Sequence, residues 1–130
     1  MRTSRGTRPA LVLAGLAAWA VAVPWLATAL GLGLDVPARL EVVDHVVPGV
    51  VVVACAGILA RWRRGEPGAG LGRLGACAVA CLAGLWITAT HLTLVPEAVD
   101  GVTAWGPALL HLSAGPPIAA LALWTLFSEP

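Results

Sequence analysis

Apolar residues along this chain gather in four long stretches, and short segments rich in charge, glycine or proline separate them. The stretches cover approximately residues 10–34, 42–60, 74–95 and 103–127. An α-helix needs about 20 mainly apolar residues to cross the hydrocarbon core of a bilayer, and each stretch is about that long. The pattern therefore predicts an all-α membrane protein, in which residues 1–130 form a single up-down bundle of four transmembrane helices.

Composition supports this class and leaves no room for a soluble domain. Hydrophobic residues make up 58% of the chain and charged residues 12%, and the mean hydropathy is +0.86. Soluble domains carry about 25% charged residues. We therefore expect the lipid bilayer to be the main partner, together with other membrane subunits or further copies of the chain, and we expect no nucleic acid partner.

The distribution of arginine predicts the orientation of the bundle, since the chain contains no lysine. Only Arg39 follows the first stretch, whereas seven arginines flank the opposite ends of the helices, namely Arg2, Arg5, Arg8, Arg61, Arg63, Arg64 and Arg73. By the positive-inside rule, both termini are cytoplasmic and the chain is a multi-pass protein of the plasma membrane. The first stretch exceeds the roughly 7–15-residue core of a cleaved signal peptide, so we expect a retained helix.

This orientation places most acidic residues at the outer face of the membrane. They are Asp35, Glu41, Asp44, Glu97 and Asp100. Trp25 and Trp105 would then lie at the outer interface, and Trp62 and Trp124 at the inner one, where indoles are enriched. The outer end of the bundle is therefore expected to be both acidic and amphipathic.

Prolines predict irregular helix geometry at several depths. Those that we expect to disturb or end a helix are Pro24, Pro48, Pro96, Pro116 and Pro117. Proline lacks the donor that would bond to the carbonyl four residues earlier, which frees the carbonyls of Ala20 and Asp44. We expect Pro96 to stop the third helix and the Pro116–Pro117 pair to interrupt the fourth. Broken helices of this kind build binding sites in membrane transporters.

The third stretch has one face of small and polar residues. Cys77, Cys81, Gly84, Thr88 and His91 follow one another at spacings of four, three, four and three. Residues at these spacings share a helix face, which would pack against protein instead of lipid. Because both cysteines lie on one helix, we interpret them as packing residues and not as a disulfide pair.

All three histidines fall near the outer ends of separate helices. At a rise of 1.5 Å per residue, His45, His91 and His111 each lie about 6–9 Å below the outer boundary. Three imidazoles with a vacant coordination position form a common catalytic or transport metal site, and Asp44 can serve as a fourth ligand or an orienting acceptor. The sequence therefore predicts a pocket that binds a divalent metal or another small ligand.

Two other roles for these histidines stay open. Two imidazoles can hold a haem as axial ligands, and only non-covalently, because no C-x-x-C-H motif is present. Alternatively, the histidines bond to carbonyls or acidic side chains, and the chain is a structural or assembly subunit of a larger membrane complex.

The sequence gives little support for an enzyme. It contains no G-x-S-x-G motif, no P-loop lysine and no pair of carboxylates deep in the membrane. A histidine-bound metal that activates water would need a general base, for which Asp44 and Glu97 are the candidates. We expect binding more than catalysis.

Overall fold

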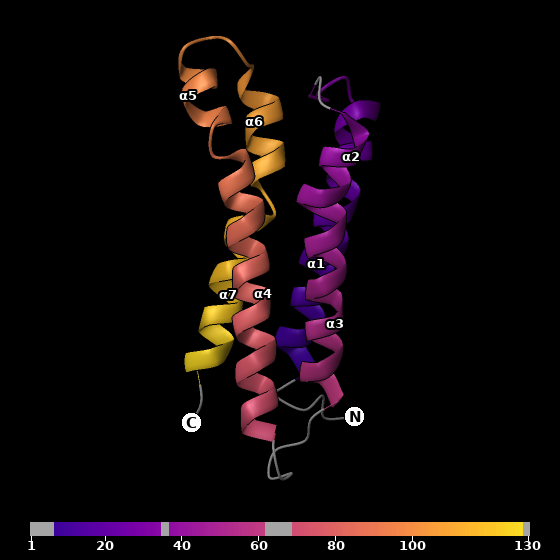
Figure 1. Ribbon diagram of the computed structural model, residues 1–130, viewed down its shortest axis with the longest axis vertical. Helices are drawn as coiled ribbons and strands as arrows, with labels where there is room; N and C mark the ends of the chain where they lie inside the picture. The colour runs from indigo at the N-terminus through magenta and orange to yellow at the C-terminus, as the bar shows by residue number, and fades with distance from the viewer. Residues whose placement is uncertain (1–6, 35–36, 62–68, 129–130) are drawn as a thin grey trace.

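The computed structural model describes residues 7–34, 37–61 and 69–128, and these residues form a bundle of four helical spans (Figure 1). The first span is α1 (Thr7–Ala29), and the second combines α2 (Ala38–Glu41), the π-helix η1 (Val42–Val46) and α3 (Val47–Arg61). The third combines α4 (Ala69–His91) and α5 (Leu94–Val99), and the fourth α6 (Trp105–Leu112) and α7 (Gly115–Phe127).

Within the described residues, four helical segments are long and apolar enough to cross a membrane. They confirm the predicted all-α bundle of four transmembrane helices. The start of α1 and the end of α7 lie at the same end of the bundle (Figure 1), and the cytoplasmic location of that end stays a prediction. Several residues used in the orientation argument lie outside the described residues: Arg2, Arg5, Asp35, Trp62, Arg63 and Arg64.

The first helix ends at Ala29, before the predicted limit at Leu34. Gly31 adopts a φ of 69°, a left-handed conformation that glycine tolerates well. Its N–H donates to the carbonyl of Thr28 at 3.1 Å, and the next N–H, that of Leu32, donates to the carbonyl of Ala27 at 2.8 Å. These two bonds form a Schellman motif, which ends the helix and satisfies its last carbonyls.

Each of the other three spans is irregular a few residues before a proline, and in the second span the irregularity is the π-helix η1, which precedes Pro48. The third span breaks after His91 instead of at Pro96, and Pro96 lies in the first turn of α5. The fourth span breaks after Leu112, as the Pro116–Pro117 pair predicts. A proline removes the bond to the carbonyl four residues earlier and clashes with that carbonyl, so the irregularity appears upstream of the ring.

The interior of the bundle is a core of small residues. Alanine dominates it, around the fully buried side chains of Leu13, Val52, Ile87 and Ile118. Helices α4 and α7 approach most closely at two glycines. A Cβ atom on Gly84 would lie 2.6 Å from the backbone nitrogen of Ala119, so no larger residue fits there without movement.

The predicted polar face of the third span does face protein. Cys77, Gly84 and His91 are buried, and Cys81 and Thr88 are half-buried. Large apolar side chains on other faces, such as Leu82, Trp86 and Leu123, are exposed. This arrangement suits lipid, because hydrocarbon accepts apolar side chains and leaves polar ones to pair inside the bundle.

Candidate metal centre

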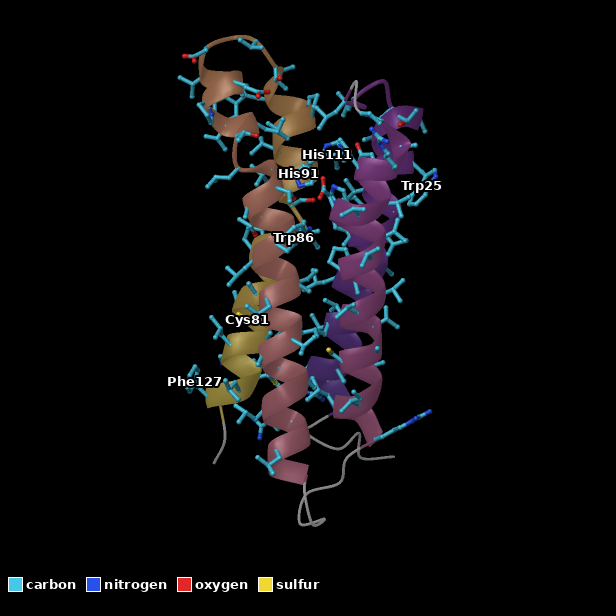
Figure 2. All side chains as sticks on the ribbon, viewed as in Figure 1. Trp25, Cys81, Trp86, His91, His111 and Phe127 are labelled. Carbon is cyan, nitrogen blue, oxygen red and sulfur yellow. The ribbon has the colours of Figure 1, made fainter. Side chains whose placement is uncertain are left out.

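Three spans bring the three histidines together at one end of the bundle. His45 lies on η1, His91 is the last residue of α4, and His111 lies on α6. The ring centroids of His45 and His91 are 4.5 Å apart, and each lies 5.4 Å from that of His111. Figure 2 places His91 and His111 far from Phe127, toward the opposite end of the bundle. All three rings are buried.

The turn that carries His45 is a π-helix. The N–H of Val47 bonds to the carbonyl of Val42, five residues earlier. Pro48 follows directly, and it cannot donate to the carbonyl of Asp44. The wider turn accommodates the missing bond, and single π-turns of this kind recur at functional sites. The proline therefore shapes the backbone that directs His45 into the bundle.

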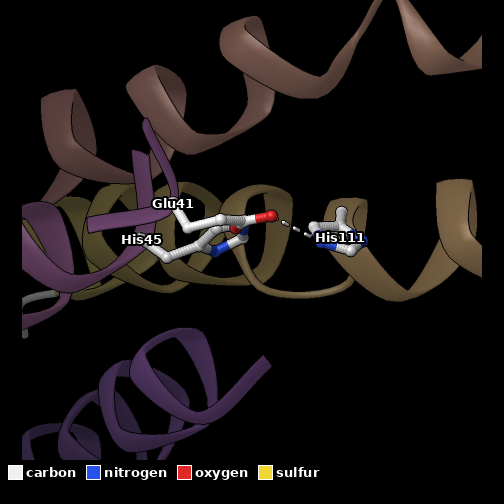
Figure 3. A group of neighbouring side chains, drawn as sticks. All are labelled: Glu41, His45 and His111. Carbon is white, nitrogen blue, oxygen red and sulfur yellow. Dashed lines mark ion pairs between the residues drawn. The ribbon is translucent and has the colours of Figure 1, made fainter. Parts of the chain in front are cut away.

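Glu41 joins the histidines, although the sequence argument treated it only as a marker of the outer boundary. Its Oε1 lies 3.6 Å from Nε2 of His111, and its Oε2 lies 3.8 Å from Nε2 of His45. Figure 3 shows Glu41 and His45 on one helical segment, with His111 approaching from another. The signal was present in the sequence, because Glu41 and His45 are four residues apart and share a helix face.

Hydrogen bonds to backbone carbonyls orient two of the imidazoles. Nδ1 of His91 lies 2.9 Å from the carbonyl oxygen of Ile87, and Nδ1 of His111 lies 3.0 Å from that of Pro107. A carbonyl only accepts, so Nδ1 carries the proton and donates in both rings. In the neutral imidazole, Nε2 then presents a lone pair. Both lone pairs point into the cluster.

His45 lies between these groups. Its Nε2 is 3.1 Å from Nε2 of His91, and because His91 carries its proton on Nδ1, Nε2 of His45 is the donor when both rings are neutral. The backbone of Ala20 also lies close to the His45 ring, but Nδ1 makes no well-formed hydrogen bond. Pro24 cannot donate to the Ala20 carbonyl, so the proline of the first helix leaves this acceptor free.

The cluster contains more acceptors than donors. Among the described residues, four buried side-chain atoms lack a hydrogen-bond partner, and three of them belong to Glu41, His45 and His111. The fourth, the Thr125 hydroxyl, lies on α7. Nearly all buried polar groups in proteins are bonded, and leaving one unpaired costs about 1–3 kcal/mol. A cation at the centre would give Oε2 of Glu41 and Nε2 of His111 a partner, whereas Nδ1 of His45 faces the Ala20 backbone.

One ligand atom from each of Glu41, His45 and His111 fits a group in which all atoms lie within 4.8 Å of one another. His91 contacts this group through His45. Asp44, the fourth ligand expected from the sequence, is not part of the group. It is half-buried and lines a neighbouring cavity of about 390 Å³, together with Glu41 and His91. Its role as a ligand stays a prediction.

No family model matches the chain, and neither a curated protein nor a solved structure shows significant similarity to it. The functional argument therefore depends on the geometry of the site. That geometry is a set of three buried imidazoles and one half-buried carboxylate, contributed by three spans, at one end of an apolar bundle.

Proposed function

We propose that this protein is a small integral membrane protein that binds one divalent transition-metal ion at the outer end of the bundle. Glu41, His45 and His111 are the proposed ligands, and His91 completes the site. The observation that carries the proposal is the pair of buried, unpartnered atoms Oε2 of Glu41 and Nε2 of His111, with Nε2 of His45 beside Glu41. Each is a nitrogen or oxygen of a kind that binds metal ions.

The distances suit a single ion. Two ligands of one zinc ion, with bonds of about 2.0–2.2 Å, lie no more than about 4.4 Å apart. Nε2 of His45 lies 3.1 Å from Nε2 of His91 and 3.8 Å from Oε2 of Glu41, and Oε1 of Glu41 lies 3.6 Å from Nε2 of His111. One ligand atom from each of Glu41, His45 and His111 lies within 4.8 Å of the others, slightly more than one ion spans. Small rotations of these side chains therefore bring the pairs to one centre.

The ligand types define the class of metal. Imidazoles suit zinc, copper, iron and nickel, whereas magnesium and calcium prefer sites made only of oxygen. The Nδ1–H groups of His91 and His111 donate to backbone carbonyls, an arrangement that metal-binding histidines adopt almost always. These bonds hold the rings with Nε2 toward the proposed ion.

The same geometry disfavours haem. A haem held by two histidines lies between them, with one ring on each side of the macrocycle. The rings of His45 and His91 instead touch each other, with their Nε2 atoms 3.1 Å apart. We therefore favour a single ion over a macrocycle.

A purely structural role would predict a different cluster. In that role, a protonated histidine would pair with Glu41, and the polar atoms would satisfy one another. Instead, the separations from Glu41 to His45 and His111 exceed hydrogen-bonding distance, and Nε2 of His111 has no partner. We interpret the histidines as ligands and not as supports for the helices.

Metal titration of the purified full chain in lipid nanodiscs tests this proposal. We expect one Zn²⁺ or Co²⁺ per chain, measured by elemental analysis after removal of weakly bound ions. Tetrahedral or five-coordinate Co²⁺ would also give visible absorption bands. His111→Ala and Glu41→Gln should each lower the affinity at least tenfold, because each removes a proposed ligand.

Asp100→Asn is the matched control, because it removes one negative charge from an exposed position in the connection between α5 and α6. It should bind metal as the parent protein does. A parent protein that takes up no metal, or a His111→Ala variant that binds with unchanged affinity, would refute the proposal.

A further inference from the structure

A cavity of about 390 Å³ lies beside the cluster and is lined by residues of the second and third spans and by Leu34 and Thr103 of the connections before and after them. Leu40 and Thr93 line it and are exposed, whereas His91 lines it and is buried. The cavity therefore extends from the surface to the His91 imidazole and to Glu41. Its volume is within the range of cavities that bind small ligands.

Three carboxylates line this cavity at different depths. Glu41 belongs to the proposed metal centre, while Asp44 and Glu97 are half-buried on other parts of the wall. The Thr103 hydroxyl donates to Oε2 of Glu97 at 3.1 Å, which orients that carboxylate. The residues that line the cavity include no arginine, and Arg39 is exposed outside it.

Hydroxyl groups complete the polar lining. Thr90, Thr93 and Thr103 contribute to the cavity wall. Oxygen atoms of carboxylates and hydroxyls can replace part of the water around a hydrated cation. Beyond this wall, the fully buried His111 presents its unpartnered Nε2 toward Glu41. The cavity thus leads from oxygen groups to nitrogen groups.

We propose that this cavity is the entry route for the metal ion, and that Asp44 and Glu97 collect divalent cations from the outer solution and pass them to Glu41 and the histidines. This inference rests on the proposed function. Asp44 is then an electrostatic positioning residue and not a ligand. A negatively charged cleft with apolar walls concentrates cations and can raise association rates by about 10–10³-fold.

In this proposal, the rate at which the metal ion binds and the number of ions bound depend on different residues. Removing the two collecting carboxylates should slow association without removing any proposed ligand. It should also weaken the dependence of the rate on salt, because salt screens long-range attraction. The number of ions bound at saturation should not change.

Stopped-flow mixing of Co²⁺ with the full chain in nanodiscs of zwitterionic lipid measures these rates. We expect the double variant Asp44→Asn/Glu97→Gln to associate about tenfold more slowly than the parent at low ionic strength. It should still bind one ion per chain. Asp100→Asn is again the control, because it changes one nearby charge outside the cavity, and its rate should stay within twofold of the parent.

Each outcome has a defined meaning. An unchanged association rate in the double variant, or an equal loss in Asp100→Asn, would overturn the entry route and leave the metal centre intact. Loss of bound metal at saturation in the double variant would also overturn it, because Asp44 or Glu97 would then act as a ligand. A parent protein that binds no Co²⁺ would overturn both proposals.

Discussion

The two ends of this bundle differ in how their helices pack and in which side chains they bury. Toward the start of α1 and the end of α7, small residues let the helices approach closely, and the core is mostly alanine. At the other end, proline-related irregularities in three spans surround a carboxylate and three imidazoles, several of whose atoms lack partners. The first end is closely packed. The second has irregular helical turns and unpaired polar atoms around side chains of the kind that bind metal ions.

This difference indicates that the closely packed end stabilises the fold and that the histidine end carries the proposed site. Sites for binding commonly carry unsatisfied or irregular features that the rest of the fold must tolerate. If this division holds here, changes at the two ends should affect different measurements. Variants of the histidine cluster should lose metal, and variants of the glycine contacts should lose stability.

The largest expected effect comes from adding and removing metal. A ligand that binds only the folded protein stabilises it by about 4 kcal/mol when its free concentration is 1,000 times its dissociation constant. Zn²⁺ should therefore raise the free energy of unfolding of the parent protein by about this amount, and chelation should reverse the gain. Unfolding in detergent mixtures measures it. A similar gain in His111→Ala would show that the ion binds elsewhere.

The next effect concerns the contact between α4 and α7. A Cβ atom on Gly115 would lie 2.7 Å from the backbone nitrogen of Thr88, so Gly115→Ala should lower the free energy of unfolding by about 2–3 kcal/mol. Gly57→Ala is the matched control, because nothing lies within 4 Å of its added Cβ atom. It should be neutral or stabilising by about 0.5–1 kcal/mol.

Gly115 opens α7 and packs against Thr88, three residues before His91, so this pair of variants also tests whether helix packing next to the histidine cluster is separable from metal binding. The fraction of Gly115→Ala that stays folded should bind metal with the affinity of the parent. Equal stability of Gly115→Ala and Gly57→Ala would mean that the glycine contact does not hold the helices together.

The smallest effect is expected from the histidine cluster in the absence of metal. His111 keeps one hydrogen bond, from Nδ1 to the Pro107 carbonyl, while its Nε2 lacks a partner. Replacing such a half-satisfied buried group by an apolar one of similar size is often neutral or stabilising. His111→Leu should therefore keep or raise the free energy of unfolding of the metal-free protein, by up to about 1 kcal/mol. If the histidine instead formed an ion pair with Glu41 as a structural support, the same change would cost several kcal/mol.

The length of the apolar stretches was enough to predict the four spans, because each span must cross a hydrocarbon core of nearly fixed thickness. The shared depth of His45, His91 and His111 followed from counting residues along separate helices. That count does not specify how each helix is rotated about its axis, which is why it did not place Glu41 beside the histidines. The π-turn at Val42–Val46 depends on how the chain accommodates Pro48, which hydropathy does not report.

Helix ends were predicted less well than helix existence. Pro96 marks an irregularity, but the break occurs near the carbonyl that its ring opposes, at Leu92 and Thr93. A proline affects its own position and also the position four residues earlier, and a prediction of helix ends must consider both. The same consideration places the break between α6 and α7 before the Pro116–Pro117 pair.

X-ray absorption spectroscopy of the zinc-loaded protein tests the central claim most directly, because it reports the ligands of the ion itself. The proposed centre predicts nitrogen and oxygen neighbours at about 2.0–2.2 Å, with the outer-shell scattering of two or three imidazole rings. A sulfur neighbour at about 2.3 Å would place the ion at the cysteines, and a spectrum without imidazole scattering would contradict the histidine site.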